Sequence, residues 1–182
     1  MQFDYDECRE IFHRALLTAL HEHRDAIRKL HATEAIWAIS YYIIPWQPYI
    51  SIAFRLSSES NYPASLVSAD WKYFDFITDR KSQALVSARD FAHEAYESVS
   101  DDSKRCQDVA HLIYLAAADA LLDPSIATLL QSLGINALEI GDALPRGYFK
   151  YIVIDEDKVI KANYCDIVCA NRVTRRLLGR TV

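Results

Sequence analysis

The chain has 182 residues, of which 51% are hydrophobic and 25% are charged, a composition typical of globular proteins that excludes bulk disorder. This length favours a single domain covering residues 1–182, with enough chain to bury a core without disulfides or metals. The formal net charge of −5 argues against a general nucleic-acid binder, since such proteins usually carry a basic patch.

The first predicted element is one long helix over residues 4–31. Apolar side chains such as Phe12, Leu16 and Leu20 recur at three- and four-residue steps, which places them on one face of a helix. The N-terminus is acidic and begins with no apolar run, so no signal peptide is expected. No uninterrupted apolar stretch approaches the roughly 20 residues that span a membrane, and we expect a soluble, cytoplasmic protein without a membrane partner.

A β-hairpin is predicted next, over residues 36–56. Residues 36–44 are rich in β-branched and aromatic side chains, and residues 49–56 place an apolar side chain at every second position. The intervening Pro45 and Pro48 cannot sit inside a strand ladder, so they mark the turn. Residues 66–77 are aromatic and fit either a strand or a loop that covers the core.

Later elements complete an α+β pattern. Four further helices are expected over residues 79–99 (capped by Thr78 or Asp79), 103–122 (capped by Asp101 and Asp102), 125–133 (between Asp123-Pro124 and Gly134) and 164–178 (ended by Gly179). Residues 148–154 and 158–163 flank Asp155-Glu156-Asp157, which predicts a second hairpin with an acidic tip. We therefore predict an α+β fold with a mostly antiparallel sheet, built from two hairpins and packed against about five helices.

Residue types that carry chemistry are present but not in the spacing that chemistry needs. His21 and His23 are two apart and so point to different sides of a helix, where they cannot bind one metal ion. Cys165 and Cys169 share a helix face, but a closed zinc site needs four ligands. No phosphate-loop, dinucleotide-binding or serine-nucleophile motif occurs. The sequence therefore predicts no metal, cofactor or catalytic residue, and the protein is not expected to be an enzyme.

Charge and aromatic residues instead indicate a protein partner. Residues 1–157 carry a formal charge of −10, and an acidic body attracts cationic partners. Trp46 lies in the proline-flanked turn, where burial is difficult, and Tyr49 follows it. Exposed tryptophan and tyrosine are favoured anchors in protein interfaces. We expect the partner-binding residues to be these aromatic side chains and the acidic tip: Trp46, Tyr49, Asp155, Glu156 and Asp157.

The layout of the chain resembles a family of small bacterial domains. A long N-terminal helix, an aromatic hairpin, Ala69-Asp70-Trp71 leading into a helical middle, and a late hairpin and helix resemble domains of unknown function encoded beside polymorphic toxins. Several of those domains are treated as immunity proteins. The resemblance implies a cytoplasmic immunity protein that binds a cognate toxin domain and covers its active site or substrate path.

Two other classes of function remain open. The chain fits a small ligand-binding protein or enzyme with a pocket between sheet and helices, for which the middle helices offer polar side chains: His93, His111, Tyr114 and Asp119. It also fits a structural subunit that dimerises through the aromatic hairpin. The sequence does not decide between a monomer and a dimer.

Overall fold

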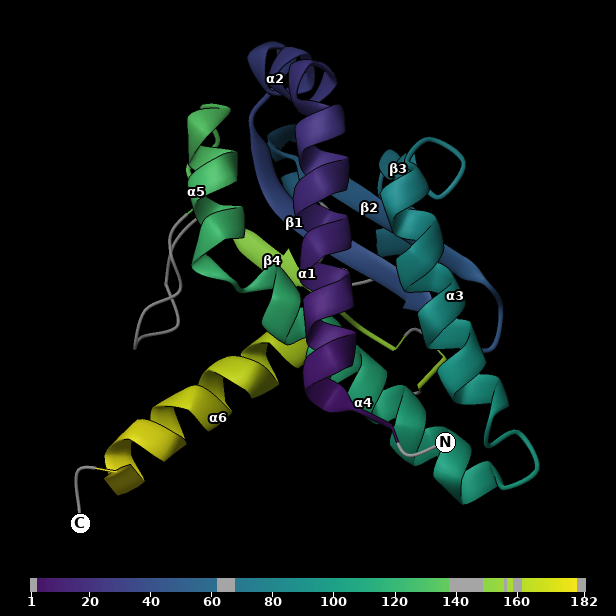
Figure 1. Ribbon diagram of the computed structural model, residues 1–182. Coiled ribbons are helices and arrows are strands. Elements are labelled where there is room, and N and C mark those ends of the chain that lie inside the picture. The colour runs from purple at the N-terminus through teal and green to yellow at the C-terminus, as the bar shows by residue number, and fades with distance from the viewer. Residues whose placement is uncertain (1–2, 62–67, 138–148, 156, 159–161, 180–182) are drawn as a thin grey trace.

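A four-stranded sheet is covered on one face by helices in the computed structural model (Figure 1), which describes residues 3–61, 68–137, 149–155, 157–158 and 162–179. The strand order is β3-β2-β1-β4. The strands are β1 (Ile36–Ile44), β2 (Tyr49–Leu56), β3 (Tyr73–Thr78) and β4 (Lys150–Ile152). The β1–β2 and β2–β3 pairs are antiparallel and β4 is parallel to β1, so the fold is α+β with a mixed sheet.

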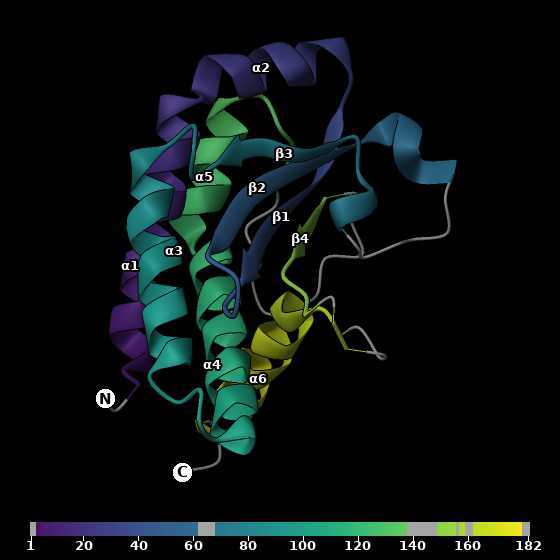
Figure 2. The same ribbon diagram turned by 90° about the vertical axis from the view of Figure 1, so that its right-hand side faces the viewer.

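The described residues form six α-helices. They are α1 (Tyr5–Glu22), α2 (Arg24–Thr33), α3 (Gln83–Glu97), α4 (Ser103–Leu121), α5 (Pro124–Ser132) and α6 (Tyr164–Gly179). Figure 2 shows α1, α3 and α4 together on one side of the sheet. Within these elements no single helix combines the length and apolarity needed to cross a membrane, although α4 and α5, bent by 49° at their junction, meet both criteria as a pair.

The predicted helix over residues 4–31 is wrong in its continuity. α1 ends at Glu22, and α2 begins at Arg24 and turns across the end of the sheet (Figure 2). His23 lies at the break, where its Nε2–H donates to the Lys81 carbonyl at 3.2 Å. The apolar spacing continues through the break because Ile27 and Leu30 of α2 are also buried in the core. Periodicity therefore does not reveal the bend at His23, where the chain contacts a carbonyl that is remote in sequence.

The first hairpin is confirmed. β1 and β2 pair from Ile44 opposite Tyr49 through Ala38 opposite Arg55. Alternate side chains, including Ile39, Tyr41 and Phe54, are fully buried against the helices. In the ambiguous aromatic segment, a 3₁₀ turn over Ser68–Asp70 precedes β3, while residues 66–67 lie outside the described part of the chain.

The middle helices begin where side chains cap them, with one correction. Of the two aspartates predicted to cap α4, Asp101 and Asp102, the N-cap is Asp102, which accepts hydrogen bonds from the backbone N–H groups of Lys104 and Arg105. Helix α3, however, begins after Ser82, because Thr78 belongs to β3 and Asp79 forms an ion pair with Arg89. A side-chain cap therefore marks the start of α4, whereas Ser82 precedes α3 without a side-chain capping hydrogen bond.

The predicted second hairpin is not seen among the described residues, where its first strand pairs elsewhere. β4 lies in the predicted place but pairs in parallel with β1, with Ser40 opposite Ile152. At the start of α6, the N–H of Tyr164 donates to the Val153 carbonyl at 2.8 Å. Within the predicted return strand, Lys158, Ala162 and Asn163 are not in a strand, and residues 159–161 lie outside the described residues.

Candidate functional site

The outer surface of the helical layer carries a continuous groove between α1 and α3. One depression of about 580 Å³ lies along Ile11, Thr18 and Ala84, and a second of about 520 Å³ lies at the ends of α1, α3 and α4. The two depressions share Phe91 and Glu94, so they form one groove. We call it the acid-rimmed groove, defined by Phe3, Asp4, Glu7, Ile11, Arg14, Asp90, Phe91, Glu94, Ala95 and Arg105.

The floor of the acid-rimmed groove is apolar and partly open. Phe3, Ile11 and Phe91 pack against the core, yet each keeps part of its surface accessible. Ile11 lies beside the fully buried stripe of α1, and Phe91 lies beside Ala92 on α3. A sequence pattern assigns such flanking positions to the core, although here they form the edge where two helices meet.

Carboxylates dominate the rim of this groove. Four acidic side chains line it, against the guanidinium groups of Arg14 and Arg105. Asp90 is paired with Arg89 at 2.7 Å, and Asp4 caps α1 by accepting the N–H of Glu7 at 3.0 Å. The carboxylates of Glu7 and Glu94 are exposed, and no hydrogen bond or ion pair holds either one within the described residues. These two groups are therefore available to a cationic partner.

The aromatic residues predicted to bind a partner are more buried than expected. Trp46 is partly buried against the core, with its ring 6.0 Å from that of Tyr96. The preceding Pro45 carbonyl accepts a hydrogen bond from His93 Nδ1 at 3.0 Å, which ties the turn to α3. The Trp46 ring is therefore more buried than its place in the turn predicted, and its role in partner binding stays a prediction.

Tyr49 is also fixed within the molecule. Its hydroxyl donates to Asp75, and its ring stacks on Phe74 at 6.1 Å. Burial and the Asp75 hydrogen bond raise the pKa of Tyr49 well above its usual range. Tyr42 packs edge-on against both rings, so Tyr49 belongs to an aromatic cluster on the sheet face opposite the helices.

The predicted acidic tip is also incorrect in its geometry. Asp155 is only 7% exposed, and its carboxylate accepts the N–H of Asp157 at 3.2 Å and lies 3.6 Å from Lys158 Nζ. Asp157 is exposed, and Glu156 lies outside the described residues. Within the described chain, no contact joins Asp155 or Asp157 to Trp46 or Tyr49. The five predicted residues therefore do not form one described surface.

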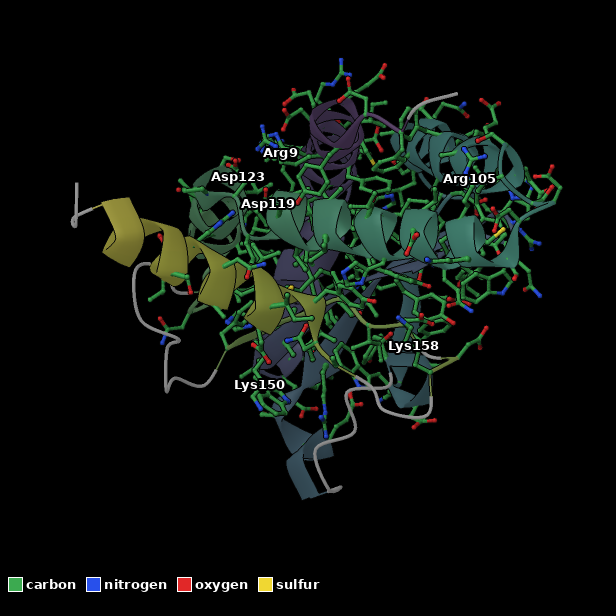
Figure 3. All side chains as sticks on the ribbon, turned by 90° about the horizontal axis from the view of Figure 1, so that it is seen from below. Arg9, Arg105, Asp119, Asp123, Lys150 and Lys158 are labelled. Atoms are coloured by element: carbon green, nitrogen blue, oxygen red, sulfur yellow. The ribbon has the colours of Figure 1, made fainter. Side chains whose placement is uncertain are left out.

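The alternative polar residues separate into three places. His111 Nδ1 lies 3.2 Å from the Tyr164 hydroxyl, and Tyr114 packs on the same ring at 5.2 Å. Burial, together with the nearby Lys158 ammonium, lowers the pKa of His111. Asp119 is instead paired with Arg172, and His93 contacts the turn at Pro45. Lys158 and Asp119 lie on opposite sides of α4 (Figure 3), so these residues do not converge on one pocket.

A serine, a histidine and an aspartate lie together at the start of α5. Their sequence spacing did not predict this cluster. His13 Nε2 lies 2.8 Å from Ser125 Oγ and 3.4 Å from Asp123 Oδ1. A catalytic triad needs the serine to donate to one imidazole nitrogen and the aspartate to accept from the other. Here both contacts fall on the same nitrogen, and the Ser125 hydroxyl donates to Asp123 at 2.7 Å. The arrangement caps a helix and does not activate a nucleophile.

Sulfur and metal chemistry find little support in the described residues. All four cysteines are free and buried, and burial raises the pKa of Cys8 and Cys165. In the part of the chain described here, no group of three or more His, Cys, Asp or Glu side chains is placed to hold a metal ion.

The fold and the acid-rimmed groove define the chain as an α+β protein with an accessible, negatively charged helical surface. No protein-family model, curated protein or solved structure matches it.

Proposed function

We propose that the chain is a cytoplasmic immunity protein that neutralises a bacterial toxin domain by binding it through the acid-rimmed groove. The observation that carries this proposal is the combination of an apolar floor with two free carboxylates, Glu7 and Glu94, at its edge. Many toxin domains that act on nucleic acids need a cationic surface, and an acidic inhibitor can compete there with the phosphate backbone. The resemblance in chain layout points to the same class of partner.

The groove fits an amphipathic helix better than a flat surface. It extends along α1 from Phe3 to Thr18, which corresponds to roughly 22 Å at the helical rise per residue. A partner helix of about four turns would span it and place its apolar side chains on Ile11 and Phe91. Lysine or arginine side chains on the same helix would reach Glu7 and Glu94.

The test first looks for a toxin-like module in the coding sequence that neighbours the gene for this chain, and then uses that module as the binding partner. The purified module and the full chain are mixed, and the dissociation constant is measured by titration calorimetry at two salt concentrations. We expect a 1:1 complex whose affinity falls with salt, because exposed charges are screened. Co-expression with the module should restore growth of the host cell. A module that neither binds nor is neutralised would refute the proposed function.

Two pairs of charge reversals locate the surface. The first is Glu7→Lys with Glu94→Lys in the groove; the second is Asp157→Lys with Asp166→Lys, two exposed acids outside it. Both pairs change the net charge equally. Close interfacial charges contribute about 1.5 kcal/mol or more each, so the groove pair should weaken binding by about 100-fold or more. If the second pair has the larger effect, the partner binds near the predicted acidic segment and the groove assignment is wrong.

A further inference from the structure

A separate pocket of about 500 Å³ lies at one end of the sheet. Four parts of the chain line it: α2, the start of β1, the turn after α5 and the residue before β4. The lining residues from these parts include His31 of α2, Ile36 and Trp37 of β1, Gly134 of the turn, and Phe149 before β4. We call it the end pocket. Figures 1 and 2 place α2 and α5 at the same end of the molecule, where β1 begins. Its volume falls within the usual range for small-molecule sites, about 300–1,000 Å³.

The walls of the end pocket are held in place by the fold. Trp37 donates its indole N–H to the Leu56 carbonyl at 2.8 Å, so the ring cannot rotate freely. Gly134 adopts a φ of 89°, which L side chains rarely adopt, and brings the chain back beside His31. Phe149 is buried at 6% exposure and supplies a second aromatic wall. The pocket therefore has a mostly apolar lining that includes two aromatic side chains.

One hydrogen-bond donor is oriented by the same framework. His31 Nδ1 accepts the backbone N–H of Ile36 at 3.1 Å. In the neutral ring the proton therefore lies on Nε2, which becomes a donor. No described residue accepts from Nε2, and His31 lines the pocket. A ligand with an acceptor oxygen can use this donor.

Two positively charged side chains lie over the Trp37 ring. The guanidinium of Arg55 lies 4.9 Å and the ammonium of Lys150 lies 5.7 Å from the ring centroid. The nearby carboxylate of Glu34 stays charged, but hydrogen bonds from Ser57 Oγ and from the N–H of Ser58 hold it against the segment that follows β2. Lys150 is exposed and lies well apart from Arg105 of the acid-rimmed groove (Figure 3). Neither cation lines the end pocket itself, but both lie close to its Trp37 wall, whereas four carboxylates line the groove.

We propose that the end pocket binds a planar aromatic carboxylate. The aromatic body would lie against Trp37 and Phe149, while the carboxylate would accept from His31 Nε2–H and pair with Lys150. A phosphate ester is disfavoured relative to a carboxylate because its second negative charge would be still more costly to desolvate against a mostly apolar lining. A neutral aromatic compound would gain nothing from the cation. This site is independent of the proposed function, because none of its lining residues belongs to the acid-rimmed groove.

The experiment compares 2-naphthoate with the neutral 2-naphthalenemethanol, by titration calorimetry and tryptophan fluorescence on the full chain. Two variants remove the polar contacts: Lys150→Gln, and His31→Asn, whose side-chain oxygen still accepts from Ile36. Lys104→Gln is the matched control, since Lys104 is an exposed lysine on α4. Thermal unfolding verifies that each variant is folded.

We expect 2-naphthoate to bind in a 1:1 ratio and at least 10-fold more tightly than the alcohol. Lys150→Gln should weaken binding about threefold, as for an exposed charge pair, and His31→Asn about 10-fold, as for a hydrogen bond to a charged group. Lys104→Gln should have no effect. The proposal is overturned if naphthoate does not bind saturably up to millimolar concentration, if the alcohol binds equally well, or if both variants leave the affinity unchanged.

Discussion

Asp123 is expected to stabilise the protein as a helix cap, and this role can be measured. Its Oδ1 accepts the backbone N–H of Ser125 at 3.0 Å and the Ser125 hydroxyl at 2.7 Å, immediately before the first turn of α5. His13 lies 3.4 Å from the same oxygen. The variant Asp123→Ala removes all three interactions, while Asp123→Asn keeps a neutral acceptor in the same place.

The size of the loss follows from these contacts. Removing an N-cap acceptor costs about 1 kcal/mol, and removing a negative charge from a helix N-terminus costs about 0.3–1 kcal/mol. The partly buried contact with His13 adds about 0.5 kcal/mol. We therefore expect Asp123→Ala to lower the free energy of unfolding by about 2 kcal/mol, and Asp123→Asn by less than half of that.

The pH dependence of this loss provides a second measurement. Burial acts to raise the pKa of Asp123, but hydrogen bonds from Ser125, with His13 and Arg9 nearby, outweigh it and lower the pKa. A lowered pKa in the folded state stabilises the protein above the ordinary carboxyl pKa of about 4, and this stabilisation is lost as the pH falls further. In urea unfolding followed by circular dichroism, the wild type should therefore lose its advantage over Asp123→Asn in acid. Equal stability of wild type and Asp123→Ala at pH 7 would refute the capping role.

Three further predictions concern the core and the turn after α5. Phe12 is fully buried, with its ring 5.7 Å from that of Tyr41, so Phe12→Ala should lower the free energy of unfolding by about 4 kcal/mol in a urea titration; a loss below 1 kcal/mol would contradict this packing. Gly134→Ala should cost about 1 kcal/mol because of the positive φ, and an unchanged unfolding midpoint would argue against that conformation. The four buried cysteines should resist a thiol reagent at pH 8 in the folded protein and all react in denaturant; rapid labelling of Cys8 in the native state would contradict its burial.

The sequence predicted the start of a helix well where a capping residue marks it. Asp102 before α4 and Asp123-Pro124 before α5 satisfy backbone N–H groups that no other part of the helix can satisfy, so their positions are specified by sequence alone. The break at His23 depends on the Lys81 carbonyl, which is remote in the chain. The parallel placement of β4 beside β1 depends equally on a long-range pairing that strand propensity does not encode.

The candidate site was less predictable than the fold. Trp46 was expected to be exposed because it lies between two prolines, but α3 packs against that turn and Tyr96 covers part of the ring. Asp155 belongs to an acidic run, yet Lys158 and a backbone N–H draw it inward. The acid-rimmed groove arises only when two helices lie side by side, so Glu7 and Glu94 are far apart in sequence and give no joint signal.

The acid-rimmed groove and the end pocket should act independently. They share no lining residue, and the groove begins at the N-terminal end of α1, whereas the pocket lies beyond the break at His23. Energetic effects at sites without shared partners usually add within about 0.5 kcal/mol. Combining Glu94→Lys with Lys150→Gln should therefore leave the naphthoate affinity of Lys150→Gln unchanged within about twofold, measured by calorimetry. A larger change would mean that α1 and α2 move together, and that binding at the sheet end alters the helical surface.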